Sequence, residues 1–314
     1  MANLKFQNIK NYYVAVRKKL AKFFINKEGI LVMTLLVRNE DDIIRENIEY
    51  HIKHGVDFII ATDNGSIDKT REILEEYEKK GCLFLIDEPL QDNSQAGWVN
   101  KMGEIALNKY KADYIIHCDA DEFWFAKSGN LKKEISQSKK DVLIVNVKNV
   151  LLNNKNGEEC FPSDALYLVI NPLTTENLQE DSKNENLYIF NYPSKLFSKT
   201  SKGYQYVTKG NHALAYKNAN IKKGNSEDVI IYHFPVRNKE RFINKVINSG
   251  SATESNKDLH PSLSWHIRRW YEAYKNGTIN IEYEKLLMSK DRAIDLIDDG
   301  VLEEFDFIKF KEKQ

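Results

Sequence analysis

The fold is decided by the stretch Tyr114-Ile-Ile-His-Cys-Asp-Ala-Asp-Glu-Phe-Trp124, an apolar run that ends in three carboxylates. Short runs rich in β-branched and aromatic residues form buried strands, so this run predicts a strand that carries an acidic cluster at its carboxyl end. Asp119 and Asp121 are two positions apart, so an extended backbone, or a short turn, would bring both carboxylates together. Such hard oxygen ligands suit Mg²⁺ or Mn²⁺ better than a soft metal. The alternative is a strand end whose carboxylates are merely solvated.

Two upstream segments show the same change from apolar to polar residues. The first is Met33-Thr-Leu-Leu-Val-Arg-Asn-Glu40, and the second, Ala61-Thr-Asp-Asn-Gly-Ser-Ile-Asp-Lys-Thr70, follows an apolar run over 58–60. Helical patterns separate the apolar runs: Gly55 would end one helix, and Ser66 is a plausible N-cap for a helix over 67–80. Strands alternating with helices predict an α/β fold with parallel βαβ units. The predicted strands cover residues 30–37, 58–62, 83–86, 114–118 and 141–147.

Taken together, the three segments resemble the nucleotide-binding half of family 2-type glycosyltransferases with the GT-A fold, over residues 30–125. In that family one strand ends in a segment like Asp-Asp-Gly-Ser-x-Asp and a later strand carries an Asp-x-Asp metal motif. Here Asn64 stands where a second Asp is usual. The resemblance implies a doubly wound, mostly parallel sheet flanked by helices. It also implies metal-dependent transfer of a sugar from a nucleotide-sugar donor, UDP-linked, with Mn²⁺ or Mg²⁺.

Ligands of open α/β sheets bind beyond the carboxyl ends of the strands. The side chains expected there are Arg38, Asn39, Asp63, Asn64, Asp119 and Asp121. Asp63 could accept a hydrogen bond from a pyrimidine N–H, or it could cap the following turn, and Asn64 could do either. Arg38 and Asn39 are expected near the nucleotide, although Arg38 could pair with Glu40 instead. The resemblance implies that Asp121 binds the metal directly and that Asp119 contacts the ribose or the metal's water shell.

Downstream fragments extend the resemblance, less specifically, to about residue 250. They are Pro193-Ser-Lys-Leu-Phe197, Lys209-Gly-Asn-His212 and Ile230-Ile-Tyr-His-Phe-Pro-Val-Arg237, and they look like the bacterial family 2-like group with an Asp-Ala-Asp-Glu-Phe motif. The resemblance implies that His233 completes the metal site; otherwise it is a buried histidine bonded to backbone. Lys195 and Arg237 are candidate phosphate contacts or solvated surface charges.

An inverting transfer needs a general base, and two residues could serve. Glu122 adjoins the metal motif, and His212 lies in a turn-like Gly-Asn-His. Glu122 could instead point into the fold, because its neighbour Asp121 points out. The acceptor would be a glycan or a lipid-linked saccharide.

The predicted organisation has three parts. Residues 1–28 interleave lysines with aromatic and aliphatic residues, which predicts an amphipathic basic helix. That helix could lie on an anionic membrane or pack on the catalytic domain. Residues 29–250 would form the GT-A domain, with a nucleotide-binding half over 29–125 and an acceptor half over 126–250. Residues 251–314 would form a helical C-terminal extension.

Composition narrows the class of protein. Lysine and arginine number 46, as do aspartate and glutamate, so the chain lacks the basic excess of a general nucleic-acid binder. Its three cysteines suggest neither a disulfide framework nor a zinc site. No apolar run is long enough to span a bilayer, and no signal peptide is evident. We therefore expect a cytoplasmic protein, with a peripheral position at the inner face of the membrane if the basic helix binds lipid.

Other functions fit less well. A sugar-nucleotide nucleotidyltransferase would carry a glycine-rich basic loop after its first strand, and residues 37–40 contain no glycine. A phosphatase that uses an Asp-x-Asp pair would carry it after the first strand, whereas here the pair follows the fourth. A non-catalytic nucleotide-binding or interaction module would not need Asp119, Asp121 and His233.

Overall fold

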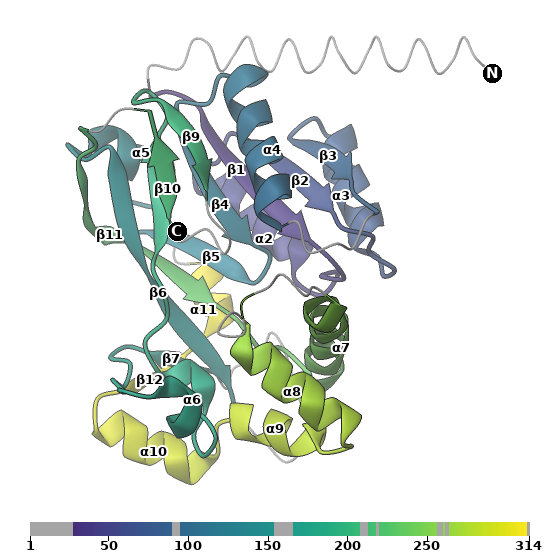
Figure 1. The fold of residues 1–314 in the computed structure, drawn as a ribbon. Coiled ribbons are helices and arrows are strands. Elements are labelled where there is room, and N and C mark those ends of the chain that lie inside the picture. The colour runs from purple at the N-terminus through teal and green to yellow at the C-terminus, as the bar shows by residue number, and fades with distance from the viewer. Residues whose placement is uncertain are drawn as a thin grey trace. The chain divides into compact units, whose positions relative to one another are not determined.

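The computed structural model describes residues 28–89, 95–153, 166–207, 213–217, 220–255, 260 and 264–312. The basic stretch over 1–27 and His212 lie outside the described residues. The chain forms two compact units (Figure 1): unit 1 comprises Met1–Asn146 and Ser194–Ile231, and unit 2 comprises Val147–Pro193 and Tyr232–Gln314.

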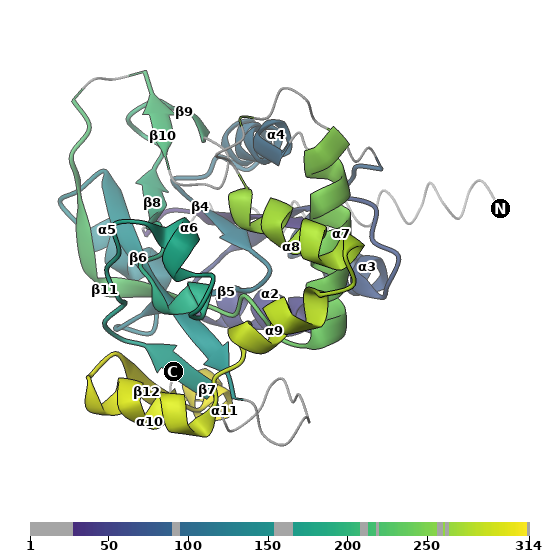
Figure 2. The same ribbon diagram turned by 60° about the horizontal axis from the view of Figure 1, so that its bottom comes forward.

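Unit 1 is built on a parallel sheet. Its strands are β1 (Leu31–Val37), β2 (Phe58–Asp63), β3 (Leu83–Asp87) and β4 (Tyr114–Asp119), in the order β4-β1-β2-β3. The connecting helices are α2 (Ile44–Lys53), α3 (Thr70–Lys79) and α4 (Gln95–Asn108). Figure 2 shows α4 on one side of these strands and α2 on the other. The predicted α/β class, with a mostly parallel sheet flanked by helices, is confirmed.

Alternating side chains of the strands form the core of unit 1. Val32, Ile60 and Ile115 pack with Met102 and Ala106 of α4, and all five are fully buried. Strands buried on both faces read as continuous apolar runs, which is why the sequence pattern located them. Gly55 follows α2 with a φ of +101°, a conformation that glycine adopts without strain, and this supports its predicted role as the helix stop.

Antiparallel strands extend the sheet of unit 1. β8 (Lys195–Lys199) pairs with β4, and the first residues of β6 (Val142–Leu152) pair with β8. β5 (Glu122–Ala126) pairs with β11 (Lys223–His233). The unit also contains α5 (Leu131–Gln137) and a two-stranded sheet of β9 (Tyr204–Val207) and β10 (Leu214–Tyr216). The sequence pattern did not reveal β5, because the strand opens with the charged Glu122.

The predicted start of α3 was wrong. The helix begins at Thr70, not at residue 67, and Lys69 occupies the N-cap position. Ser66 donates its hydroxyl to Asp63 Oδ1 at 2.6 Å, so this hydroxyl holds the turn after β2 instead of capping the helix. The residues 64–69 therefore form a polar loop at the end of β2.

Unit 2 combines a small sheet with helices. β7 (Leu166–Val169) pairs antiparallel with β12 (Leu302–Phe305) and with the end of β6. The helices are α6 (Leu178–Asp181), the 3₁₀ turn η1 (Leu187–Ile189), α7 (Lys239–Ser255), α8 (Trp265–Lys275), α9 (Ile279–Leu286), α10 (Lys290–Asp298) and α11 (Phe307–Glu312). The C-terminal region is thus mainly helical, as the sequence predicts, but it also contributes strand β12.

Helices α7 and α8 pack closely. Phe242 and Trp270 lie with their ring centroids 5.1 Å apart, and both side chains are buried. A Cβ atom at Gly250 would overlap the ring of Tyr271, so this close approach requires glycine. Among the described helices, none combines the length and apolar character that crossing a bilayer requires.

Candidate functional site

The register of the parallel strands brings the predicted motifs to one edge of the sheet. Val37 pairs with Asp63 across β1 and β2, and Leu36 pairs with Asp119 across β1 and β4. The carboxyl end of β1 therefore has the end of β2 on one side and the end of β4 on the other. Residues separated by more than fifty positions in the sequence meet at the edge where ligands of open α/β sheets bind.

Asp63 holds the turn that follows β2. Its residue is only 2 % exposed, and its Oδ1 accepts hydrogen bonds from the backbone N–H of Ser66 at 3.1 Å and from the hydroxyl of Ser66 at 2.6 Å. Arg71 Nη1 lies 3.5 Å from Asp63 Oδ2. This is the turn-capping geometry that the sequence offered as the alternative. A contact between Asp63 and a nucleobase stays a prediction.

Asn39 ties the end of β1 to the same turn. Its φ is 56°, a left-handed conformation that asparagine tolerates better than most residues. Its backbone N–H donates to Ser66 Oγ at 3.0 Å, and its Oδ1 accepts from the backbone N–H of Ile67 at 2.8 Å. Asn64 Nδ2 donates to the carbonyl oxygen of Glu88 at 3.0 Å. The two predicted nucleotide-binding asparagines thus hold the loops of this edge together.

Arg38 lies beside Asn39 and is half-buried. Its Nε is buried and makes no hydrogen bond within the described part of the chain. The sequence offered a pairing of Arg38 with Glu40 as the alternative, but no such pairing reaches Nε. A buried donor without an acceptor is costly, so an anionic group bound at this edge would satisfy it.

The acidic cluster of Asp119, Asp121 and Glu122 is organised around Lys195. Lys195 is 1 % exposed, and its Nζ lies 2.6 Å from Asp119 Oδ2 and 2.6 Å from Glu122 Oε1. Glu122 Oε2 accepts the backbone N–H of Asp119 at 3.2 Å. The lysine comes from β8, which runs beside β4. One ammonium group therefore binds two carboxylates of the cluster.

These charges shift one another's protonation. Burial raises the pKa of Glu122, the nearby carboxylates add to that rise, and Lys195 opposes it. For Lys195, burial lowers the pKa, but Asp119 and Glu122 outweigh burial and the net shift is upward. Lys195 is therefore an ammonium at neutral pH. The interior location that the sequence offered as the alternative for Glu122 is the one observed.

Asp119 and Asp121 differ in exposure. The side chain of Asp119 remains 37 % exposed although Lys195 holds one of its oxygens. Asp121 lies in the turn between β4 and β5 and is 6 % exposed. A short turn, one of the two geometries predicted for this pair, thus follows Asp119. Among the described residues no group of three or more His, Cys, Asp or Glu side chains is arranged to hold a metal.

Unit 2 contains His233 and Arg237, both buried. His233 Nδ1 lies 2.8 Å from Asn149 Oδ1, a side-chain partner. Arg237 is 6 % exposed, so it is not a solvated surface charge. Asn149 itself was missed. It stands among apolar residues of β6, and only its polarity in such a strand could have marked it.

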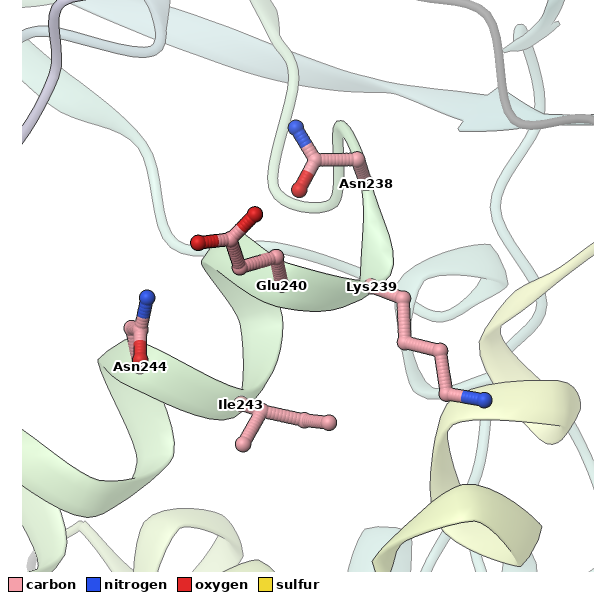
Figure 3. A pocket seen from close by; sticks show the side chains of 5 residues that line it. All are labelled: Asn238, Lys239, Glu240, Ile243 and Asn244. Carbon is pink, nitrogen blue, oxygen red and sulfur yellow. The ribbon is translucent and has the colours of Figure 1, made fainter.

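A cavity of about 530 Å³ opens at the start of α7 (Figure 3). It is lined by Asn238, Lys239, Glu240, Ile243 and Asn244. Asn238 accepts the backbone N–H of Arg241 at 2.8 Å and so caps the helix. None of the predicted site residues lines this cavity.

Comparison with solved structures gives weak similarities. TarS 1–349 of S. aureus has 16% identity, a TM-score of 0.38, and matches over 80% of this chain and 69% of its own. Its complex with UDP-GlcNAc has 15% identity and a TM-score of 0.39, and the match covers 82% of this chain and 72% of that one. A third match is glucosyl-3-phosphoglycerate synthase from Mycobacterium tuberculosis in complex with Mn²⁺, UDP and glucosyl-3-phosphoglycerate. It has 14% identity and a TM-score of 0.26, and the match covers 42% of this chain and 48% of that one. No curated protein matches the chain.

The family comparison is decisive. The profile of glycosyltransferase family 92 matches residues 30–260, which include both strand ends of the candidate site. The expectation of a glycosyltransferase is confirmed at this level, whereas the narrower likeness to family 2-type enzymes stays a prediction. The chain belongs to glycosyltransferase family 92, and it is a glycosyltransferase.

Proposed function

We propose that this glycosyltransferase takes its sugar from a UDP-linked donor and transfers it, with inversion, to a glycan or lipid-linked acceptor. The observation that carries the proposal is the register that places Asp63 and Asp119 on either side of the end of β1. The sheet edge then offers carboxylates for a metal and polar side chains for a nucleotide. The family 2-like pattern of these segments, Asp-x-Asp included, agrees with this use.

Arg38 supports a donor that carries phosphates. Its buried Nε lacks an acceptor among the described residues, and a phosphate oxygen is the acceptor that guanidinium groups bind best. We assign Asn39, Asp63 and Asn64 to the nucleoside. A carboxylate has several acceptor positions, so Asp63 can bind Ser66 and still accept a uracil N–H. Arg237 remains a second candidate phosphate contact.

The donor types at this edge, carboxylate oxygens, suit a hard divalent cation. We assign Asp121 as a direct ligand of Mn²⁺ or Mg²⁺, Asp119 as a contact of the ribose or the metal's water shell, and His233 as a further ligand. A metal bound there would offset the negative charge of the leaving nucleoside diphosphate. Carboxylate oxygens and one imidazole are suitable donors for Mn²⁺.

For Lys195 we favour a use other than the predicted phosphate contact. Its contacts with Asp119 and Glu122 at 2.6 Å favour the role of an internal counter-ion over that of a phosphate contact. The Lys195 ammonium group holds Asp119 Oδ2 in place and offsets the cost of burying the Glu122 carboxylate. Both oxygens of Glu122 are engaged, which favours His212 over Glu122 as the general base that deprotonates the acceptor.

The remaining assignments concern organisation and location. We propose residues 29–250 as the catalytic domain, with the nucleotide half over 29–125 and the acceptor half over 126–250, and 251–314 as a helical extension. We further propose a cytoplasmic enzyme whose basic stretch over 1–28 binds the anionic inner face of the membrane. The interleaved lysines and aromatic residues of that stretch support this.

A thermal-shift panel tests the proposed donor and metal together. UDP, GDP, ADP and CDP are each added with Mn²⁺ or with EDTA, because a ligand that binds only the native state raises the melting temperature. UDP with Mn²⁺ should give the largest rise, and EDTA should abolish most of it. Equal shifts with all four nucleotides would contradict the UDP assignment, and equal shifts in EDTA would contradict the metal.

A further inference from the structure

We propose that Asn149 is a positioning residue that holds neutral His233 as the tautomer with hydrogen on Nδ1. Nε2 is then the nitrogen that presents a lone pair. This inference rests on the proposed function in one respect, namely that His233 binds the metal. Its structural half, the tautomer, stands on the contacts of Asn149 alone.

The two residues are buried neighbours within unit 2. Asn149 lies in β6 and is 2 % exposed, and His233 ends β11 and is 5 % exposed. Asn149 Oδ1 is 2.8 Å from His233 Nδ1, and Asn149 Nδ2 is 2.8 Å from the carbonyl oxygen of Tyr188. The amide therefore spans a backbone carbonyl on one side and an imidazole on the other.

The carbonyl of Tyr188 determines which way the amide faces. A carbonyl oxygen only accepts hydrogen bonds, so it must meet the NH₂ group of Asn149. The reverse orientation would place two oxygen acceptors 2.8 Å apart with no hydrogen between them. The amide oxygen consequently faces His233. Because that oxygen also only accepts, the short contact requires a hydrogen on Nδ1.

This tautomer is the one that prepares a histidine for metal binding through Nε2. Histidine ligands usually donate the hydrogen of their other ring nitrogen to a fixed acceptor, which orients the ring and fixes the tautomer. Two aromatic rings hold the imidazole plane as well: the Tyr192 centroid lies 4.8 Å away and the Tyr188 centroid 6.1 Å away. The ring is thus oriented before any metal arrives.

Long-range ¹H–¹⁵N NMR on full-length protein labelled with ¹⁵N-histidine tests the tautomer directly. His233→Gln identifies the His233 signals by their loss. The wild-type ring should show hydrogen on Nδ1 and none on Nε2. Asn149→Leu, which cannot accept a hydrogen bond, should release the ring to the Nε2–H form or to a mixture. Wild-type signals with hydrogen on Nε2 would overturn the proposal, whatever the enzyme transfers.

Calorimetric titration with Mn²⁺ tests the positioning role. Asn149→Leu should weaken Mn²⁺ binding by about 10- to 100-fold, the usual effect of removing such a partner. Asn146→Leu, the same change at an exposed asparagine of β6, is the matched control.

The outcomes separate the two hypotheses. Equal Mn²⁺ affinity in wild type and Asn149→Leu would overturn the positioning role and leave the proposed metal site intact. Failure of Mn²⁺ to bind wild-type protein would overturn the metal assignment, and with it the use of Nε2. The NMR spectrum would still report whether Asn149 fixes the ring. Circular dichroism of each variant checks that it is folded.

Discussion

The carboxylates at the ends of β2 and β4 are stabilised in opposite ways. Asp63 is held by Ser66, three residues further along the chain. Asp119 is held by Lys195, whose contact spans 76 positions and also serves the buried Glu122. The first arrangement is a local turn in which the backbone and hydroxyl donors of one nearby serine bind the carboxylate, with Arg71 beside it. The second is a cluster of opposite charges that forms only when β8 lies beside β4. We therefore expect it to be more sensitive to mutation.

The largest effect should follow from removing the charge of Lys195. Lys195→Met leaves Glu122 buried without its cation, and breaking a buried pair in this way costs about 3–5 kcal/mol. Urea unfolding followed by circular dichroism measures this loss in the free energy of unfolding. The double variant Lys195→Met/Glu122→Gln should recover most of it. Lys183→Met, at an exposed ion pair, should cost less than about 1 kcal/mol, and an equal loss there would contradict the comparison.

Asp121→Asn should separate activity from stability. The change removes a carboxylate assigned to the metal, so transfer should fall by about 10² to 10³, while the melting temperature stays nearly unchanged. Turnover of UDP-sugars by the purified variant is the measurement. A rate above about a tenth of the wild-type rate would refute the metal assignment. Asp119→Asn should lower nucleotide affinity more than the rate of transfer.

The β1–β4 side of the edge should also respond to acid. Burial lowers the pKa of His117 to about 3, and the ring is bonded to Thr34 Oγ1 at 2.6 Å and to the Tyr204 hydroxyl at 2.8 Å. Because the native pKa lies below the unfolded value of about 6.5, the contribution is complete above pH 6.5 and is lost as the pH falls. Between pH 7 and 5, His117 alone should cost about 2 kcal/mol.

Urea unfolding at several pH values, in wild type and in His117→Gln, measures this slope. The variant should lose less stability over the same interval, since it has one buried imidazole fewer to protonate. His260→Gln, at an exposed histidine, is the control. Parallel curves for wild type and His117→Gln would show that His117 is not the titrating group.

The smallest effect is expected at Ser66. Ser66→Ala removes hydroxyl bonds to Asp63 and to the backbone of Asn39. The site is partly open to water, so the loss should be about 1 kcal/mol in the free energy of unfolding. A cost as large as that of Lys195→Met would show that the two strand ends are not stabilised differently after all.

The same contrast explains how far the sequence alone could lead. The strands that carry Asp63 and Asp119 were predictable, because buried parallel strands give continuous apolar runs, and the turn-capping role of Asp63 follows from residues within three positions. The start of α3 was misplaced because Ser66 bonds backward to Asp63 instead of capping forward. The sequence pattern did not show which way the Ser66 hydroxyl would bond, and it did not show strand β5 either.

Long-range partners could not be predicted. Nothing near Lys195 indicates that it would meet Asp119 and Glu122, and its charge suggested a phosphate contact instead. The proposed role of Asn149 likewise depends on its contact with His233, which is 84 positions away. Hydrogen bonds and ion pairs between distant segments depend on strand register, which the hydrophobic pattern of a single strand does not determine.

The contact of Lys195 with the acidic cluster also bears on the order of events in folding. Parallel pairing of β1 with β4 must close a long segment of chain, and such non-local pairing is slow. The lysine belongs to a still later strand, so during synthesis β4 leaves the ribosome well before its counter-ion does. Until β8 docks, burying Glu122 would leave a carboxylate without its cation. We therefore expect the acidic end of β4 to stay hydrated until late, and the candidate site to form only after most of unit 1 has been made.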